Sequence, residues 1–357
     1  MRILIVTDAW LPQVNGVVRT LQYTAADLQT WGHQVEFLTP EGFRTMPMPT
    51  YPDIRLSLFP YRKVSRRIVE YNPDAIHIAT EGPLGMAARR WCLNNGFPFT
   101  TAYHSRFPEY VQLRTGLPLS VSYAWLRRFH GAAEAVMVPT PVVRRDLEAR
   151  GFNNVASWSH GVDLNTFHPE GRADALATEP PVFLYVGRVA VEKNLAAFLE
   201  LDLPGSKWVA GVGPQREQLA RRFPSVNWLG VLDSQQLAEV YRSASVFVFP
   251  SKTDTFGLVM LEAMACGCPV AAYPVTGPLD VIGDSPAGVM HEDLKTACLQ
   301  ALEIDRRLPR QHAEQFGWEH ASRQFLSHLR PHGAELDLAQ WAELNPRTLE
   351  RQQTSES

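Results

Sequence analysis

The stretch Phe249-Pro-Ser-Lys-Thr-Asp-Thr-Phe-Gly-Leu-Val-Met-Leu-Glu262 continues as Ala-Met-Ala-Cys-Gly-Cys-Pro-Val270 and predicts a buried strand that passes into a helix. Residues 246–249 are all apolar, which is typical of a strand covered on both faces. Apolar residues then recur at helical spacing from Leu258 to Ala265, and Gly267 ends the helix. Such strand-to-helix junctions are the units from which open α/β sheets are built.

Two acidic residues mark this junction. Asp254 lies in the loop at the carboxyl end of the strand, and Glu262 lies about one and a half turns into the helix. Open α/β sheets bind their ligands at the carboxyl ends of the strands. Ionised carboxylates only accept hydrogen bonds, and sugars offer many hydroxyl donors, so this pair favours a hydroxyl-rich ligand.

The composition is that of a globular protein. The chain has 357 residues, of which 45% are hydrophobic and 20% are charged, and its net charge is −3. This length predicts two domains, and this charge gives no sign of nucleic-acid binding. The first 150 residues are net basic and the remainder is net acidic. A basic first half suits an anionic lipid or acceptor, and ordinary scatter of surface charge explains it equally well.

The cysteines and the N-terminus indicate a cytoplasmic protein. Cys92, Cys266, Cys268 and Cys298 are too few and too scattered for a disulfide framework, so we expect reduced, buried thiols. The opening apolar run is interrupted at Asp8, too early for a secretion signal, and no apolar run is long enough to cross a membrane.

Alternation of strand-like and helical stretches predicts two successive α/β domains. A polar stretch with flanking prolines, residues 167–181, interrupts the pattern, so we expect an N-terminal domain at 1–168 and a C-terminal domain at 169–345. A helix near residues 318–329 closes the second domain or returns to the first. The polar segment 346–357 is expected to be disordered.

Basic residues at a second junction point to a phosphate ligand. Arg188 and Lys193 lie five residues apart in the loop that follows the first strand of the second half. An arginine and a lysine at a helix start can together neutralise a diphosphate, although such residues are usually solvated surface charges. Their position on the same sheet edge as Asp254 favours the phosphate. Gly16 opens the first helix and would let a phosphate approach the backbone, although turn chemistry alone explains it too. The chain lacks an Asp-x-Asp sequence, so we expect no metal ion and no cofactor.

Taken together, the ordered motifs resemble glycosyltransferase family 4. They are Asn15-Gly16-Val17, Tyr103-His104-Ser105, Gly161-Val162-Asp163, Gly187-Arg188 with Glu192-Lys193-Asn194, and Thr253-Asp-Thr-Phe-Gly-Leu258 with Glu262-Ala263. The resemblance extends from Arg2 to about His328. It is strongest to bacterial GDP-mannose-dependent mannosyltransferases and to sulfoquinovosyl- and glucuronosyl-diacylglycerol synthases. It implies the GT-B fold, in which two Rossmann-like doubly wound domains face a central cleft, and transfer with retention of anomeric configuration.

The resemblance also implies roles for individual residues. The donor diphosphate would be held by Gly16, Arg188 and Lys193, and the donor sugar by His104 and Asp254. The backbone amides of Phe256 and Gly257 would support the sugar or a phosphate. Glu262 would hold the ribose hydroxyls, Leu232 would flank the nucleobase, and Leu258 would also contact the donor. His104, Arg188, Lys193 and Asp254 would be the catalytic residues. Many family members have glutamate in place of Asp254, which is one methylene shorter, so the identity of the sugar stays open.

The acceptor is expected to bind the first half of the chain. Trp10 and Arg19 are the candidates, and the acceptor would be a lipid or a glycan. The basic run Tyr61-Arg-Lys-Val-Ser-Arg-Arg67 has two interpretations of equal weight, a peripheral contact with the inner face of the membrane and a solvated helix face. His77 lies inside a predicted strand and is expected to be structural, and Asp163 is expected to brace a turn at the hinge.

These observations favour a retaining transferase that uses a nucleoside-diphosphate sugar. GDP-mannose ranks slightly ahead of a UDP-sugar, and a UDP-sugar-dependent glycolipid synthase is the first alternative. An epimerase or a phosphorylase-like enzyme on the same architecture, and a sugar-nucleotide-binding subunit without activity, remain as further alternatives. The developing charge on the leaving phosphate would be stabilised by Arg188 and Lys193.

Overall fold

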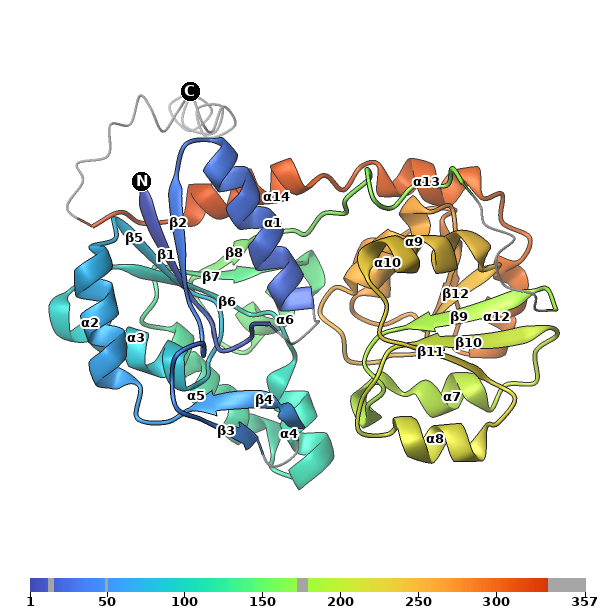
Figure 1. Ribbon diagram of the computed structural model, residues 1–357, viewed down its shortest axis with the longest axis horizontal. Helices are drawn as coiled ribbons and strands as arrows, with labels where there is room; N and C mark the ends of the chain where they lie inside the picture. The colour runs from blue at the N-terminus through green and yellow to red at the C-terminus, as the bar shows by residue number, and fades with distance from the viewer. Residues whose placement is uncertain (12–15, 49–50, 172–178, 333–357) are drawn as a thin grey trace. The chain divides into compact units, whose positions relative to one another are not determined.

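The computed structural model describes residues 1–11, 16–48, 51–171 and 179–332, and the chain divides into two compact units (Figure 1). Unit 1 comprises Met1–His104, Leu117–Ser159 and the residues from Trp318 onward. Unit 2 comprises Ser105–Gly116 and His160–Gly317. Asn15, residues 172–178 of the polar interruption and the tail expected at 346–357 lie outside the described residues.

Unit 1 is built on a parallel sheet of six strands in the order β2-β1-β5-β6-β7-β8. Its strands are β1 (Arg2–Val6), β2 (Gln34–Leu38), β5 (Ala75–Ile78), β6 (Phe99–Ala102), β7 (Ala135–Val138) and β8 (Val155–Ser157). Strands β5, β6 and β7 are buried along their whole length, as their apolar composition predicts. The strand order reverses between β1 and β5, so the loops after these two strands form the switch point of this sheet.

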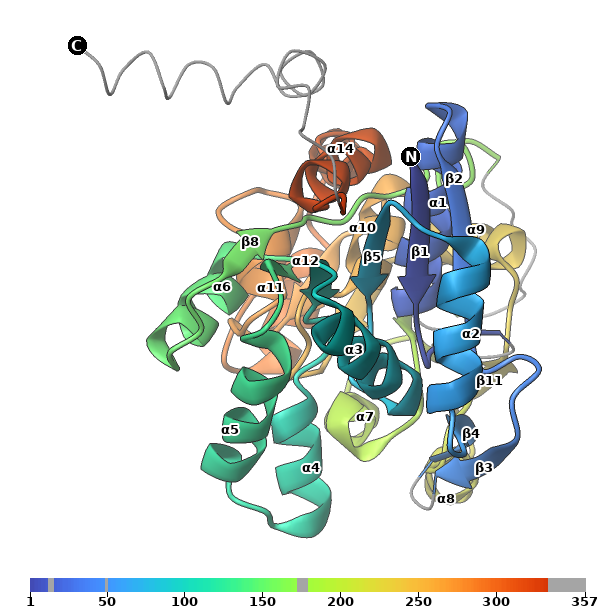
Figure 2. The same ribbon diagram turned by 90° about the vertical axis from the view of Figure 1, so that its left-hand side faces the viewer.

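Helices cover both faces of the unit 1 sheet. They are α1 (Gly16–Thr30), α2 (Tyr61–Tyr71), α3 (Pro83–Asn95), α5 (Leu119–His130), α6 (Pro141–Ala149) and α14 (Trp318–His328). Helices α2 and α3 pack against each other (Figure 2). Helix α14 packs along α1, where the ring of Tyr23 stacks on Trp318 at 4.9 Å and Ser322 donates a hydrogen bond to Asp27. The last helix of the described chain therefore packs within unit 1.

A small hairpin in unit 1 was absent from our sequence-based expectations. Strands β3 (Thr45–Met48) and β4 (Tyr51–Ser57) pair in antiparallel fashion as a separate two-stranded sheet. The segment carries Pro47 in one strand and Pro52 in the other. Proline removes a ladder donor and is tolerated in edge strands such as these.

Unit 2 contains a second six-stranded parallel sheet, in the order β11-β10-β9-β12-β13-β14. Its strands are β9 (Val182–Val186), β10 (Ser206–Ala210), β11 (Asn227–Gly230), β12 (Val246–Phe249), β13 (Val270–Ala272) and β14 (Gly288–Met290). Counted within the unit, this is the 3-2-1-4-5-6 order of dinucleotide-binding sheets. Its switch point lies between β9 and β12. The expectation of two doubly wound α/β sheets is therefore confirmed.

The remaining helices belong to unit 2. They are α4 (Phe107–Thr115), the 3-10 turn η1 (Val191–Lys193), α7 (Leu195–Leu199), α8 (Arg216–Arg222), α9 (Ser234–Ser243), α10 (Leu258–Ala265), α11 (Pro278–Val281), α12 (Leu294–Ala301) and α13 (Arg307–Ala313). Two apolar clusters fill the two faces of the sheet, one around Phe247 and Met260 and the other around Phe183 and Phe198.

The units do not follow the expected boundary at residue 168. His160–Gly317 form most of unit 2, so the boundary lies earlier in the chain. Ser105–Gly116, which we expected in the first domain, also belongs to unit 2. Residues 167–171 and 179–181, the described part of the polar stretch that suggested residue 168, lie inside unit 2. All four cysteines are free and buried, as expected.

Candidate active site

The loop after β9 carries the two predicted phosphate-binding residues. Arg188 and Lys193 both lie in it, and both side chains are partly buried. The backbone of this loop is held by Tyr185, whose hydroxyl donates a 2.8 Å hydrogen bond to the carbonyl of Arg188. Gly211, in the loop after β10, has φ +143, and a Cβ there would lie 1.9 Å from the Gly187 carbonyl oxygen. The loops after β9 and β10 therefore touch through their backbones.

Lys193 and Asp254 form an ion pair across the switch point of unit 2. The Nζ atom of Lys193 donates a hydrogen bond to Oδ1 of Asp254, which lies in the loop after β12. The two side chains are 23% and 13% exposed. Burial is the largest single influence and lowers the pKa of Lys193. The charge and hydrogen bond of Asp254, together with Tyr110 and Tyr185, outweigh burial and raise that pKa above its ordinary value. Lys193 is therefore charged throughout the physiological range.

Helix α10 begins directly beside this pair. Gly257 precedes the helix with φ +87, a backbone conformation that favours glycine, and a Cβ there would lie 2.8 Å from Met260. Glu262 lies in the second turn and is only 5% exposed. The hydroxyl of Tyr241 donates a 3.2 Å hydrogen bond to its Oε2 atom. Glu262 is therefore a buried carboxylate fixed by a protein hydroxyl.

The other predicted donor residues in unit 2 lie around the same sheet edge. Phe256 is buried, and its ring meets the ring of His160 edge-on at 4.9 Å. Leu232 and Leu258 are partly buried and pack against the first apolar cluster of this unit. The structure thus gathers Lys193, Asp254 and the start of α10 around the carboxyl ends of β9 and β12.

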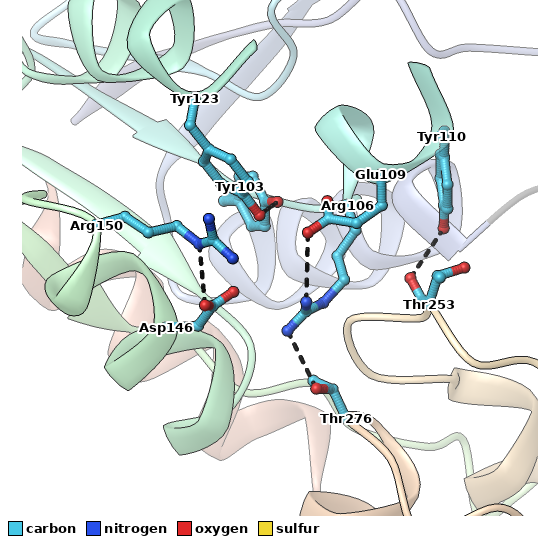
Figure 3. Close-up of polar contacts among 9 residues, drawn as sticks. All are labelled: Tyr103, Arg106, Glu109, Tyr110, Tyr123, Asp146, Arg150, Thr253 and Thr276. Carbon is cyan, nitrogen blue, oxygen red and sulfur yellow. Dashed lines mark hydrogen bonds and ion pairs between the residues drawn. The ribbon is translucent and has the colours of Figure 1, made fainter. Parts of the chain in front are cut away.

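A further group at this edge comes from α4, which sequence reasoning missed (Figure 3). Arg106 donates a 3.1 Å hydrogen bond to Thr276 Oγ1 and pairs with Glu109 at 3.5 Å. The hydroxyl of Tyr110 contacts the carbonyl of Thr253 at 3.4 Å. Burial raises the pKa of Tyr110 to about 12, and the charges of Lys193 and Asp254 act on it as well. The Arg-Phe-Pro-Glu-Tyr sequence was visible, but its partners lie far along the chain.

The other predicted residues lie in unit 1. Gly16 is the first residue of α1, and Arg19 lies in the first turn of that helix. Trp10 is partly buried, with its ring 4.4 Å from the ring of Phe37. His104 follows β6 and is partly buried, with its ring 5.4 Å from that of the buried Trp158.

Two other residues fit structural roles. His77 is fully buried and bonded to Thr100 at 2.9 Å, and burial lowers its pKa to about 3, so it stays neutral. Asp163 accepts hydrogen bonds from Asn165 and Thr166 in its own turn.

A buried carboxylate at the switch point of unit 1 was also missed. Asp8 follows β1 and accepts hydrogen bonds from the backbone amides of Leu84 and Gly85, at 2.9 and 3.2 Å, and from the hydroxyl of Thr80. These amides belong to the first turn of α3, so Asp8 caps that helix. Burial is the main cause that raises the pKa of Asp8 to about 6. With these bonds formed, Asp8 is a structural anchor of the loop.

Comparison with known proteins gives two successive family matches, whose ranges differ from those of the two compact units. Residues 14–166 match Glycosyltransferase Family 4, and residues 180–303 match Glycosyl transferases group 1. The chain is a glycosyltransferase, and its N-terminal part matches family 4. This glycosyltransferase is 28% identical over 335 residues to the GDP-mannose-dependent alpha-mannosyltransferase of Mycobacterium tuberculosis, which covers 87% of this chain and 86% of that protein.

Another relative carries a different sugar in its name, and solved structures show the same fold. The sulfoquinovosyl transferase SQD2 of Arabidopsis thaliana is 33% identical over 69% of this chain and 52% of that protein. Among solved structures, sucrose-phosphate synthase of Thermosynechococcus elongatus covers both chains in full with a TM-score of 0.72 and 21% identity. HepE of Anabaena, in complex with UDP-glucose, gives a TM-score of 0.67 at 16% identity over 91% of this chain and 98% of that one. These structures confirm the GT-B fold class.

No group of three or more His, Cys, Asp or Glu residues in the described ranges could hold a metal ion. Within the same part of the chain, no helix is long and apolar enough to cross a bilayer. Metal independence therefore stays a prediction.

Proposed function

We propose that this glycosyltransferase moves a hexose, mannose in the first instance, from a nucleoside-diphosphate sugar to a lipid or glycan acceptor. The transfer would retain the anomeric configuration and require no metal ion. Family membership favours transfer over the epimerase, the phosphorylase-like enzyme and the inactive binding subunit. The observation that carries the proposal is the Lys193–Asp254 ion pair at the switch point of the unit 2 sheet.

The ion pair supplies both kinds of group that such a donor requires. A diphosphate brought to the loop after β9 would compete with Asp254 for the ammonium group of Lys193, and Arg188 lies in the same loop. Asp254, released from Lys193, would then accept hydrogen bonds from sugar hydroxyls. The donor thus exchanges one ion pair for another, which lowers the cost of desolvating Lys193.

The chemical step follows from the same groups. The bond between the anomeric carbon and the β-phosphate oxygen breaks, and negative charge grows on that oxygen. Lys193 and Arg188 would stabilise this charge. The acceptor hydroxyl forms the new bond to the anomeric carbon, and its proton passes to the departing β-phosphate oxygen. His104 would contact the donor sugar, and Gly16, Phe256 and Gly257 would offer backbone to the phosphates and the sugar. Glu262, Leu232 and Leu258 would hold the nucleoside, and Trp10 and Arg19 the acceptor.

The choice of GDP-mannose rests on the names of the relatives. The mycobacterial relative that spans most of both chains is GDP-mannose-dependent. A UDP-sugar-dependent glycolipid synthase is the second candidate, because the plant relative is a sulfoquinovosyl transferase and a Streptococcus pneumoniae relative, 27% identical over 85% of this chain, is an alpha-monoglucosyldiacylglycerol synthase.

The test begins with thermal-shift titration of the full chain against GDP, UDP, GDP-mannose and UDP-glucose. Transfer from the preferred donor is then assayed with diacylglycerol in mixed micelles and with methyl α-mannoside, in the presence of a chelator. We expect GDP and GDP-mannose to raise the unfolding temperature more than UDP and UDP-glucose do. We also expect an α-linked product, whose anomeric configuration NMR measures directly. An inverted product, or activity abolished by the chelator, would contradict the proposed mechanism.

A further inference from the structure

Helix α5 presents apolar side chains to the solvent along one side. Leu117 precedes the helix, and Val121 and Trp125 follow at four-residue intervals, with exposures of 40%, 53% and 38%. Residues four apart share one face of a helix, so Val121 and Trp125 lie on the same side of α5. Together with Leu117, which lies just before the N-cap Pro118, they are here called the α5 stripe. Arg128 continues the same face and is exposed. Exposed apolar residues in a row, rather than scattered singly, indicate an interaction surface.

The α5 stripe ends at a basic groove of about 670 Å³. Arg62 of α2, Arg89 and Arg90 of α3, and Arg128 of α5 line it, and none of the described residues that line it is acidic. Arg89 joins α3 to the end of α5 through hydrogen bonds to the carbonyls of Arg128 and Phe129, at 2.7 and 2.8 Å. This set of four residues is here called the arginine groove.

Apolar residues also border the arginine groove. Phe59 is 95% exposed, and Met86 and Leu93 are 41% and 48% exposed. Phe59 has φ 49, a left-handed backbone conformation that is unfavourable for a residue with a bulky side chain. A strained, fully exposed phenylalanine beside a basic groove suggests that its side chain has a partner outside the folded chain.

The basic run of α2, by contrast, is mostly engaged within unit 1. Lys63 donates to the carbonyl of Gly42, Arg66 pairs with Glu70, and Arg67 pairs with Glu36. Of the four basic residues in this run, only Arg62 contributes to the arginine groove. The basic surface therefore lies across α2, α3 and α5 rather than along α2. Figure 2 shows the backbone of these three helices.

We propose that the α5 stripe, Phe59 and the arginine groove together dock unit 1 on the surface of an anionic lipid bilayer. Arginine guanidinium groups bind lipid phosphates in bidentate geometry, and each basic residue near an anionic membrane strengthens association. Val121, Trp125 and Phe59 would enter the boundary between head groups and acyl chains, where aromatic rings are favoured. The inference does not depend on which nucleotide sugar unit 2 binds.

The test is co-sedimentation of the full-length protein with two kinds of vesicle. One contains phosphatidylcholine alone, and in the other about a third of the lipid is phosphatidylglycerol. We expect binding to the anionic vesicles only, and less binding when the salt concentration rises from about 0.05 to about 0.5 M. Each of the substitutions Arg62→Gln, Arg90→Gln and Arg128→Gln should lower the partition coefficient about fivefold, and Trp125→Ala roughly tenfold.

Phe59→Gly separates docking from folding. Glycine adopts a positive φ without strain, so this variant should unfold at the same or a higher temperature and still bind anionic vesicles several-fold less tightly. Arg145→Gln on α6 and Leu299→Ser on α12, both at exposed positions, are the matched controls and should bind as wild type. Nucleotide-sugar binding in solution should be unchanged in all of these variants, which distinguishes this proposal from the proposed function.

Three results would overturn the inference. The first is equal binding to neutral and anionic vesicles, and the second is equal loss of binding in the controls. The third is self-association in size-exclusion chromatography that disappears with Trp125→Ala while no variant binds vesicles, because that would make the α5 stripe a contact between copies of this chain.

Discussion

Lys193 and Asp254, which are 61 residues apart in the sequence, form an ion pair at the switch point of the unit 2 sheet. Each residue follows one of the two central strands, β9 and β12, and the strand order places these loops next to each other. The pair thus joins an ammonium group, which is suited to phosphate, with a carboxylate, which is suited to hydroxyls.

Breaking this ion pair should cost stability. Asp254→Asn removes the charge that raises the pKa of Lys193 and leaves a partly buried ammonium group without its partner. We expect the free energy of unfolding to fall by about 1–3 kcal/mol, less than for a fully buried pair. Urea denaturation measures this. The double variant Lys193→Met with Asp254→Asn should recover part of the loss, and a strictly additive loss would contradict the coupling.

The contacts of α4 should matter for the donor. Tyr110→Phe removes the hydroxyl that contacts Thr253, next to Asp254, and Arg106→Ala removes the bond to Thr276. We expect the KM for the nucleotide sugar to rise about fivefold in each, the equivalent of about 1 kcal/mol, because the loops after β12 and β13 are held less firmly. Steady-state kinetics provide the measurement. Tyr123→Phe, which loses a hydroxyl near Tyr103 in unit 1, is the control, and an equal effect there would speak against a role for α4.

Asp8 should make stability depend on pH in the acid range. The folded state holds the pKa of Asp8 at about 6, above the ordinary 3.8, so the folded chain binds its proton more tightly. The stabilisation is complete below pH 3.8 and is lost as the pH rises to about 6, by about 3 kcal/mol in all. Relative to Asp8→Asn, wild type should therefore lose stability across this window. Urea denaturation of both proteins at several pH values from 4 to 7 measures this. A difference in the free energy of unfolding that stays constant over this range would contradict the prediction.

Gly211→Ala should be strongly destabilising. A Cβ at this position would lie 1.9 Å from the carbonyl oxygen of Gly187, and the backbone has φ +143. We expect a loss of about 2–4 kcal/mol, because the clash involves backbone on both sides. Gly230→Ala is the matched control, since φ there is +73 and a Cβ would meet nothing within 4 Å. Thermal unfolding compares the two, and similar midpoints would show that the two loops can separate at little cost.

The sequence predicted most of the sheets and helices because their apolar periodicity is local. Helix α9 was expected at Ser234–Ser243 and is found there, with Asp233 as its cap. The β3–β4 hairpin was missed because its prolines obscure the strand pattern. Ser105–Gly116 was expected in the first domain and belongs to unit 2. A helical pattern does not say which sheet the helix will pack against.

The candidate site was predicted as a set of residue types and not as a set of contacts. The sequence placed Lys193 and Asp254 at one sheet edge, but it assigned them to different parts of a donor and did not predict that they pair. Tyr110 and Asp8 were missed because their roles depend on burial and on partners distant in sequence. Local patterns carry no information on such long-range pairs.

The most direct test of the account is calorimetric titration of GDP and GDP-mannose into wild type, Lys193→Ala and Asp254→Asn. Lys193→Ala should weaken both ligands by about 10- to 100-fold, because both carry the diphosphate. Asp254→Asn should bind GDP at least as tightly as wild type, since Lys193 is released from its partner, and should bind GDP-mannose about tenfold more weakly. Equal losses for GDP and GDP-mannose in Asp254→Asn, or no loss in Lys193→Ala, would contradict the assignment of phosphate to Lys193 and hydroxyls to Asp254.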